Sequence, residues 1–193
     1  MKYDFIEIGT SDFDTLIEST QGKIGITIEP LLFYLENLPK NPSVIKVNCA
    51  ITDHDGQIDI FYLEPTDIEN YNLPGWLRGC NSINKPHPST MIELTSRGIE
   101  HLMKSHTCEC LSWKTLVKRY DIESIEFLKI DTEGHDCVII NSILNNKSVL
   151  PKKIHFEANI LTDSEIIRKT LRRLIELGYK VSMKTDTDII VEL

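Results

Sequence analysis

The chain alternates between short apolar runs rich in β-branched residues and longer segments whose apolar residues recur three and four positions apart. The short runs predict strands at residues 3–9, 23–28, 43–50, 101–111, 125–131 and 153–160. The longer segments predict helices at about residues 11–22, 31–38, 112–120, 134–144 and 164–177. Strands that alternate with helices are typical of an α/β fold, in which helices cover both faces of a mostly parallel sheet.

Two further segments predict strands outside this rhythm. Residues 57–63 alternate with period two after the turn-forming residues 53–56, which predicts a hairpin-like edge element. Residues 180–183 and 188–191 predict a terminal hairpin that adds an antiparallel edge strand. The sequence contains no internal repeat and no linker, so we expect residues 1–193 to form a single domain.

Residues 64–95 interrupt the pattern with four prolines and two glycines. A long irregular segment inside a compact domain is usually a lid or a binding loop. We therefore predict that residues 64–95 form a lid, with Trp76, Asn81 and Ser82 as candidate contacts to a substrate. A surface excursion without fixed structure is the alternative, because the segment is polar enough to allow it.

The net charge and the composition of the chain argue against some classes of binding partner. The 193 residues include 21 Lys and Arg against 29 Asp and Glu, which gives a formal charge of -8. This sign argues against nucleic acid and membrane surfaces as partners. No apolar run approaches the roughly 20 residues of a membrane span, and the N-terminus lacks the features of a signal peptide. Together with five scattered cysteines, this predicts a cytoplasmic protein, either a monomer or a homodimer.

Polar residues follow several of the predicted strands directly. In open α/β sheets, ligands bind in the crevice outside the carboxyl ends of the strands. The polar residues and the glycine at these ends are Glu7, Gly9, Glu29, Asn48, Cys49, Asp131, Glu133, Glu157 and Asn159. An unpaired buried polar group costs about 1–3 kcal/mol, so their repeated occurrence at strand ends predicts a binding site there.

Glu29 ends the second predicted strand, 22 residues after Glu7. An acidic residue at about this spacing accepts both hydrogens of a ribose diol in nucleotide-binding folds. We favour this role over capping of the helix at Pro30, because Glu is a poorer cap than Asp or Ser. The first turn, residues 9–14, lacks G-x-G-x-x-G, which disfavours a dinucleotide. Its two aspartates suit a ligand that bears positive charge, such as a sulfonium with an α-amino group.

The segment from Phe127 to Asp136, FLKIDTEGHD, is the most distinctive motif of the chain. Together with residues 111–116 and 154–157, it resembles the signature of the FkbM family of methyltransferases. Three weaker similarities follow one another along the chain in the same order as in the family. Residues 7–9 resemble its first-strand motif, residues 28–30 resemble the acidic end of its second strand, and residues 48–51 resemble the segment beside the adenine. The resemblance therefore covers nearly the whole chain.

The resemblance implies a Rossmann-like class I methyltransferase fold, with a seven-stranded, mostly parallel sheet whose last strand is antiparallel. It implies an S-adenosylmethionine-dependent enzyme that methylates a hydroxyl of a small-molecule acceptor, often a sugar or a sugar-containing metabolite. The residues expected to bind the cofactor are Glu7, Gly9, Thr10, Ser11, Asp12, Glu29, Pro30, Asn48, Cys49, Ala50 and Asp131.

Two features depart from the family pattern. Phe13 stands where the first turn of the family usually has a second glycine, and the chain begins directly at the first strand, whereas relatives generally carry an N-terminal segment that helps to cover the cofactor. These departures motivate an alternative, a degenerate methyltransferase-like module that binds a nucleoside or a partner without catalysis. An NAD-dependent enzyme of similar topology is disfavoured by the first turn.

Methyl transfer from a sulfonium is an in-line displacement, so positioning of the reactants contributes more than a base does. The candidates for positioning or deprotonating the acceptor are Asp131, Glu133, His135 and Glu157. His135 has the best unperturbed pKa for a base, although a histidine at the start of a helix is commonly a surface residue. Asn159 is a further candidate contact to the acceptor. Asp131, Glu133, Glu157 and Asn159 also offer oxygen ligands to Mg²⁺. We do not favour a metal, because alternate residues of a strand face one ligand only where the chain bends.

Overall fold

The computed structural model describes residues 1–83, 85–146 and 149–193. Its strands are β1 (Lys2–Ile8), β2 (Gly25–Ile28), β3 (Val44–Val47), β4 (Ala50–Thr52), β5 (Gly56–Tyr62), β6 (Ser82–Ile83), β7 (Lys104–Ser112), β8 (Ser124–Ile130), β9 (Lys153–Glu157), β10 (Lys180–Lys184) and β11 (Asp188–Glu192). Its helices are α1 (Leu16–Ser19), α2 (Leu32–Asn37), α3 (Pro65–Asn70), α4 (Pro88–Arg97), α5 (Trp113–Arg119), α6 (Asp136–Asn146), α7 (Ser164–Glu176) and the short 3₁₀ helices η1 (Gly75–Arg78) and η2 (Glu100–Leu102). Within the described residues, every helix is too short or too polar to span a membrane.

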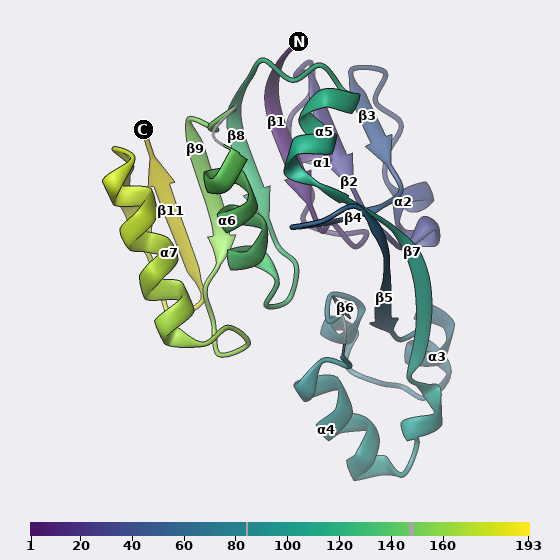
Figure 1. The fold of residues 1–193 in the computed structure, drawn as a ribbon. Coiled ribbons are helices and arrows are strands. Elements are labelled where there is room, and N and C mark those ends of the chain that lie inside the picture. The colour runs from purple at the N-terminus through teal and green to yellow at the C-terminus, as the bar shows by residue number, and fades with distance from the viewer. Residues whose placement is uncertain (84, 147–148) are drawn as a thin grey trace.

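Within the described residues, the main sheet has seven strands in the order β10-β11-β9-β8-β1-β2-β3. The pairings β1–β2, β1–β8, β2–β3 and β8–β9 are parallel, whereas β11 runs antiparallel to both β9 and β10. The predicted seven-stranded, mostly parallel sheet is therefore confirmed. Because β1, β2, β8 and β9 run in one direction, their carboxyl ends lie at the same edge of the sheet (Figure 1).

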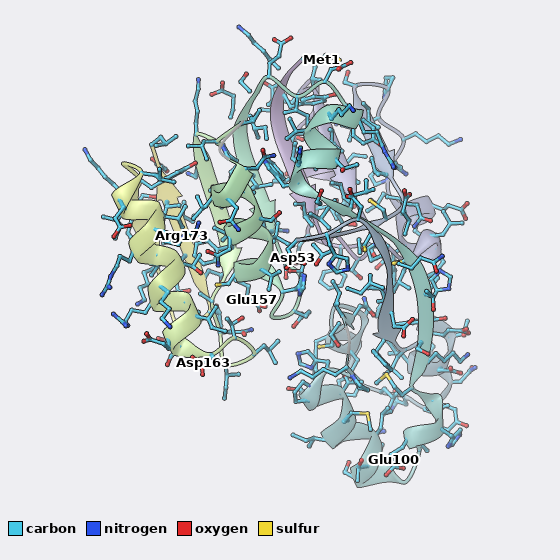
Figure 2. The ribbon with its side chains drawn as sticks, in the orientation of Figure 1. Met1, Asp53, Glu100, Glu157, Asp163 and Arg173 are labelled. Atoms are coloured by element: carbon cyan, nitrogen blue, oxygen red, sulfur yellow. The ribbon has the colours of Figure 1, made fainter. Side chains whose placement is uncertain are left out.

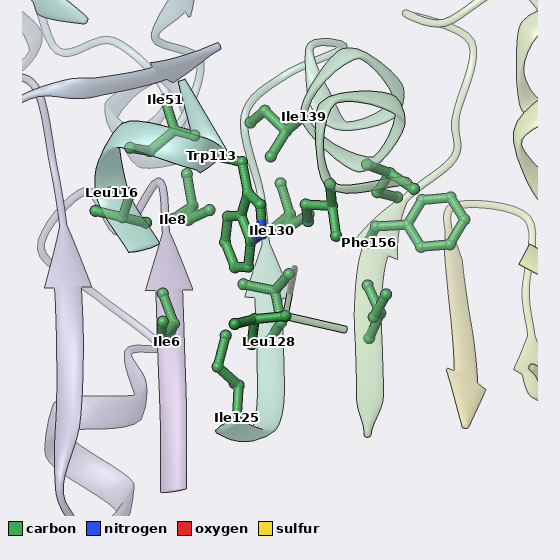
Figure 3. Packing of buried hydrophobic residues seen from close by; sticks show 14 of the residues in the cluster. Ile6, Ile8, Ile51, Trp113, Leu116, Ile125, Leu128, Ile130, Ile139 and Phe156 are labelled. Atoms are coloured by element: carbon green, nitrogen blue, oxygen red, sulfur yellow. The ribbon is translucent and has the colours of Figure 1, made fainter. Parts of the chain in front are cut away.

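Successive residues of β1 face opposite sides of the sheet, and helices cover both sides. Ile6 packs in the larger core cluster with Trp113 of α5, whereas Phe5 packs with Ile17 of α1 and Leu35 of α2. Figure 3 shows the larger cluster around Ile6, Ile8, Ile51, Trp113, Leu116, Ile125, Leu128, Ile130, Ile139 and Phe156. This core fixes the positions of the strand ends that carry the polar residues.

The strand predicted at residues 43–50 is in fact two strands in two different sheets. β3 is an edge strand of the main sheet. β4 is an edge strand of a second, four-stranded sheet, whose order is β4-β7-β5-β6. Between them, the Asn48 amide donates from Nδ2 to the backbone oxygens of Glu29 and Pro30, both at 2.9 Å, where the chain leaves the main sheet. The prediction of an edge hairpin at residues 57–63 was wrong, because β5 lies between β6 and β7 and does not pair with β4.

The prediction that residues 64–95 are irregular was also wrong. The segment contains α3, η1, β6 and most of α4. β6 pairs with the end of β5, and α4 lies below both strands in the view of Figure 1. Pro65 and Pro88 stand in the first turns of α3 and α4, where proline starts a helix instead of breaking it. The helices share a small core of their own, formed by Leu63, Ile68, Leu73, Leu77, Leu94 and Leu102.

The first helix is much shorter than the predicted residues 11–22. α1 begins after Thr15, which is its N-cap. Ser11 and Asp14 have φ values of 46° and 53°, and a right-handed helix cannot continue through residues in the left-handed region. The chain between Gly9 and Thr15 is therefore an open turn that follows β1.

Gly9, directly after β1, allows the closest approach between the ends of β1 and β8. It has a φ of 77°, and a Cβ atom built there would lie 1.9 Å from the backbone oxygen of Asp131. Gly22 has a similar φ of 76°, but a Cβ at that position would meet nothing within 4 Å. The two glycines share a positive φ and differ in what a Cβ atom would meet.

This pair separates the cost of conformation from the cost of a steric clash. We expect Gly22→Ala to destabilise the protein by about 1–2 kcal/mol, because only the left-handed conformation is penalised. Gly9→Ala should cost more than about 4 kcal/mol, because the ends of β1 and β8 must separate. Urea unfolding of both variants measures the difference, and equal losses would contradict the close approach.

Candidate active site

A cavity of about 410 Å³ lies outside the carboxyl ends of the main sheet. Its walls come from the turns after β1, β2 and β8, from the end of β9, and from η1 and β6 on the opposite side. Glu157 lies where β9 ends, on the side facing the four-stranded sheet (Figure 2). This volume falls in the range of small-molecule sites, which favours a ligand of nucleoside size or larger.

Most of the predicted site residues line this cavity. Those that do are Gly9, Thr10, Ser11, Glu29, Pro30, Cys49, Ala50, Trp76, Asn81, Asp131, Glu133 and Glu157. The predicted residues outside its lining are Glu7, Asp12, Asn48, Ser82, His135 and Asn159. Lining residues that the sequence analysis did not select are Ile8, Phe13, Asp14, Ile28, Ile51, Ile60, Gly79, Cys80, Ile83, Lys129 and Thr132.

Glu29 anchors the first turn and also borders the cavity. Its Oε2 accepts hydrogen bonds from the backbone N–H groups of Thr10, at 3.1 Å, and Ser11, at 2.9 Å, and its Oε1 accepts one from Leu31 at 2.9 Å. Burial raises the pKa of Glu29 to about 7, against these hydrogen bonds, which lower it. The carboxyl group thus joins the ends of β1 and β2 and supports the start of α2.

Glu7 lies beneath the cavity and not in its lining. Its side chain is fully buried, with Oε1 3.2 Å from Lys129 Nζ, and its Oε2 accepts the backbone N–H of Leu16 at 2.9 Å. Burial raises the pKa of Glu7, and the charge of Lys129 opposes that shift. Lys129 in turn donates to the Asp14 backbone oxygen at 3.1 Å and reaches the cavity wall. Glu7 therefore holds Lys129 in place.

His135 points to a different part of the surface. Its Nε2 lies 2.9 Å from Thr52 Oγ1, and it borders a separate hollow together with Asp53 and His54. Burial lowers the pKa of His135. Asn159 uses its Oδ1 to accept the Leu161 backbone N–H at 2.8 Å. Neither side chain reaches the main cavity.

The other predicted residues outside the lining have local structural partners. Ser82 donates from Oγ to the Lys85 backbone oxygen at 2.7 Å. Asp12 forms an ion pair with Arg78 of η1. Asn48 secures the backbone after Glu29, as described above. Asp12 and Ser82 therefore hold the segment around the cavity together.

Three carboxyl groups meet at the end of β8 and β9. Oxygen atoms of Asp131, Glu133 and Glu157 lie within 4.8 Å of one another. Burial, followed by the neighbouring negative charges, raises the pKa of Glu133 to about 8 and that of Glu157 to about 9. Asp131 opens onto the cavity, where the surrounding protein still excludes enough water to raise its pKa. The cluster can hold a proton at neutral pH.

Asp136, at the start of α6, fixes the turn that carries this cluster. It is fully buried, and its Oδ2 accepts from Thr132 N at 3.2 Å and Thr132 Oγ1 at 2.6 Å. Its Oδ1 accepts from the Glu157 backbone N–H at 2.9 Å. Burial raises the pKa of Asp136 to about 6. One side chain therefore ties the turn after β8 to the end of β9.

Two sets of donor atoms among the described residues are close enough to share a cation. One is the carboxylate cluster, and the other joins Cys80, His87 and Glu133, whose donor atoms lie within 4.8 Å of one another. All-oxygen sets suit Mg²⁺ or Ca²⁺, and mixed sulfur and nitrogen sets suit Zn²⁺. We assign no metal to either set. Protonation also neutralises the first set; in the second, His87 Nδ1 accepts the Ser89 backbone N–H, and burial raises the pKa of the Cys80 thiol to about 12.

A family model described as the methyltransferase FkbM domain matches residues 7–181. The chain belongs to the FkbM methyltransferase family. The resemblance found in the sequence is thereby confirmed. None of the curated proteins compared with the chain matches it significantly.

The fold is similar to the crystal structure of methyltransferase FkbM from Methylobacillus flagellatus KT, with a TM-score of 0.54 at 14% sequence identity. That similarity covers 100% of this chain and 44% of the other, so the chain spans less than half the length of that FkbM protein. At this identity the comparison supports the shared fold alone. The FkbM family membership supports methyl transfer as the chemistry.

The raised pKa values of the carboxylate cluster predict how stability depends on pH. Glu157 has a pKa of about 9 in the folded protein against an ordinary value of 4.5, so folding takes up a proton between these values. Stability is therefore greatest below about pH 4.5 for this group and falls as the pH rises toward 9. Replacing Glu157 with a neutral residue should therefore relieve this loss of stability at high pH.

We expect Glu157→Gln to raise the Tm at pH 8 and to leave it nearly unchanged at pH 4. The gain should be about 2–4 °C for each kcal/mol of relieved charge burial. Thermal unfolding followed by circular dichroism from pH 4 to pH 9 measures it. Glu176→Gln, at an exposed position on α7, is the control. A gain of equal size at both pH values would show that charge is not its cause.

Proposed function

We propose that this FkbM-family chain is an S-adenosylmethionine-dependent O-methyltransferase with a Rossmann-like class I methyltransferase fold. The observation that supports the proposal most strongly is that Glu29 and the Asp131–Glu133–Glu157 cluster line one cavity. One side of that cavity suits a nucleoside, and the other suits a hydroxyl that must lose a proton. A small-molecule acceptor, such as a sugar or a sugar-containing metabolite, fits a cavity of about 410 Å³.

The residues near Glu29 fit the nucleoside part of the cofactor. Oε1 of Glu29 accepts one protein hydrogen bond and has capacity for a ribose hydroxyl. Cys49, Ala50, Ile51 and Ile60 give the cavity an apolar wall that suits adenine. Asn48 supports this wall from outside, because it bonds the backbone oxygen of Glu29.

Lys129 fits the carboxylate of the methionine part. Among the described residues that line the cavity, it is the only lysine or arginine. Its Nζ is held by Glu7 Oε1 at 3.2 Å and by the Asp14 backbone oxygen at 3.1 Å. Asp14 also lines the cavity, and its carboxylate would suit an α-amino group. The charges at this end thus complement both charged groups of an amino acid.

The carboxylate cluster would orient the acceptor hydroxyl and take its proton. S-adenosylmethionine supplies a methyl group on a sulfonium, and an in-line displacement gains roughly 7–11 kcal/mol from positioning of the reactants. A carboxyl group whose pKa lies above neutrality takes up a hydroxyl proton only in its ionised fraction, which grows as the pH rises toward that pKa; such a base is worth about 10²–10⁴-fold in rate. Glu133 and Glu157 have such pKa values, and Asp131 lies beside them. His135 takes no part in this proposal, because its ring bonds Thr52 outside the cavity.

We further propose that residues 64–95 act as a lid over the acceptor, within a single domain of residues 1–193. Trp76, which is 52% exposed, and Asn81 line the cavity opposite Asp131. Asn159 and Ser82 are directed into local hydrogen bonds and are weaker candidates for acceptor contact. A cytoplasmic location fits the five cysteines, which are all free.

Cofactor binding tests the proposal directly. S-adenosylmethionine and S-adenosylhomocysteine should each stabilise the protein, and NAD should not. At 100 times the Kd, the expected gain is about 2.7 kcal/mol, which raises the Tm by roughly 5–10 °C. Differential scanning fluorimetry with the three ligands measures it. A shift with NAD alone, or with none of the three, would contradict the proposal.

Lys129 provides a sharper test of where the cofactor lies. Lys129→Met alone should destabilise the fold, because it leaves the buried Glu7 carboxylate without its partner. The double variant Glu7→Gln/Lys129→Met avoids that charge, and we expect it to bind S-adenosylhomocysteine about 10–100 times more weakly. Affinity for 5′-methylthioadenosine, which lacks the amino-acid carboxylate, should stay unchanged. Equal losses for both ligands in calorimetric titrations would place the carboxylate elsewhere.

A further inference from the structure

A further hollow, which we call the Ile160 hollow, shares two lining residues with the main cavity. Its volume is about 360 Å³, and Glu133 and Ile83 border both spaces. Its other walls come from β6 and residues 85–88, from the turn after β8, and from residues 160–161 after β9. Because Glu133 belongs to the carboxylate cluster, a molecule in the Ile160 hollow would contact a member of that cluster.

The main cavity is small for a cofactor and a second molecule of comparable size. Sites for drug-sized ligands have volumes of roughly 300–1,000 Å³, and a nucleoside joined to an amino acid is such a ligand. The main cavity, at about 410 Å³, lies near the lower end of that range. With the cofactor bound, we expect room there for the acceptor hydroxyl beside the cluster, so the rest of the acceptor needs another space.

The character of the Ile160 hollow changes from its interior to its mouth. In the interior, the side chains of His87 and Glu133 are 7% and 17% exposed. At the mouth, Pro88 and Lys85 are exposed, and Ile160 is 98% exposed. The long stem of Lys85 allows its ammonium group to remain in water. A polar interior with an apolar mouth suits a molecule that is polar at one end and apolar at the other.

The loop that carries Ile160 is held against the turn after β8. Asn159 Oδ1 accepts the Leu161 backbone N–H at 2.8 Å, and Thr162 Oγ1 donates to the Gly134 backbone oxygen at 3.3 Å. A Cβ atom built on Gly134 would lie 3.0 Å from the Cβ of Leu161, so the two segments pack closely. Ile160 is thus presented to solvent by an ordered turn, and a ligand that covered it would gain the free energy of burying its apolar surface.

We propose that the Ile160 hollow binds an amphipathic hydroxyl compound, with its hydroxyl end at Glu133 and its apolar body against Ile160. That this compound is the methyl acceptor rests on the proposed function, whereas the preference of the hollow for such a compound rests on its own geometry. A sugar that carries an apolar substituent has this character, and a bare sugar does not. Asn159 then acts indirectly, by holding the loop that carries Ile160.

Isoleucine methyl groups distinguish binding in the two spaces. Ile51 and Ile60 line the main cavity alone, and Ile160 lines the Ile160 hollow alone. Protein with ¹³C-labelled isoleucine methyl groups is titrated with octyl, phenyl and methyl β-D-glucoside, with octyl glucoside kept below the concentration at which it forms micelles. The three probes share the sugar hydroxyls and differ in the apolar substituent. We expect octyl and phenyl glucoside to shift the Ile160 signal saturably, and methyl glucoside to bind more than about tenfold more weakly.

Two matched substitutions test the contact with Ile160. Ile160→Thr keeps a β-branched side chain at an exposed position, so we expect the Tm to stay near that of the wild type. It should weaken octyl glucoside binding about tenfold, followed at the Ile83 methyl group. Ile92→Thr is the control, because Ile92 is 71% exposed on α4 and does not line the hollow. That variant should bind octyl glucoside as the wild type does.

Three results would overturn the proposal. They are equal affinities for methyl and octyl glucoside, the lack of a saturable shift at Ile160 with both octyl and phenyl glucoside, or octyl glucoside binding that Ile160→Thr and Ile92→Thr change equally or not at all. Titration with S-adenosylhomocysteine in the same spectra should shift Ile51 and Ile60. If it does not, the proposed function fails while the glucoside titrations still decide what the Ile160 hollow binds.

Discussion

The contact between the ends of β1 and β8 is the constraint on which the site depends. The backbone of Gly9 comes so close to Asp131 that no side chain fits between them, and Asp131 N donates to the Ile8 oxygen at 2.9 Å. This contact brings the turn that faces Glu29 and the turn that carries the acidic cluster to the same cavity. If the two strands were farther apart, Glu29 and the acidic cluster, to which we assign the cofactor and the acceptor in the proposed function, would no longer border one space.

The acidic groups around the cavity reduce the stability of the fold, and only some of that loss is offset. Glu7 is buried with Lys129 beside it, and Glu29 and Asp136 each accept several backbone or hydroxyl hydrogen bonds. Glu133 and Glu157 have few such partners, and an oxygen of Glu157 is buried without any among the described residues. Groups kept at this cost of stability are typical of sites that act on a ligand.

The position of the site at the carboxyl ends of the strands could be predicted from the sequence, because each polar residue there directly follows an apolar run. Glu29, Asp131 and Glu157 each follow an apolar run, and the order of strands and helices then places those ends together. The second sheet could not be predicted, because β4 and β5 pair with residues of β7 that lie 42 to 60 positions further along the chain, and no local pattern encodes that pairing. Lys129 was missed for a similar reason, since within a strand its direction depends on the register with β1. His87 had a local signal, a residue before Pro88 at the start of a helix, but the prolines suggested a loop instead.

Phe13 shows how a departure from the family pattern can be accommodated by the facing segment. A Cβ atom on Gly79 would lie 3.0 Å from the Phe13 ring, so the glycine that directly follows η1 leaves the space that the phenylalanine in the first turn fills. Ser11 donates from Oγ to the Arg78 backbone oxygen at 3.0 Å, and Asp12 pairs with the Arg78 side chain. The first turn is therefore fastened to the inserted segment at one end of the cavity, and at the other end His87 Nε2 of that segment lies 3.1 Å from Glu133 Oε2. If residues 64–95 act as the proposed lid, opening must separate both contacts, so we infer that access to the cavity is coupled to the arrangement of the turn after β8.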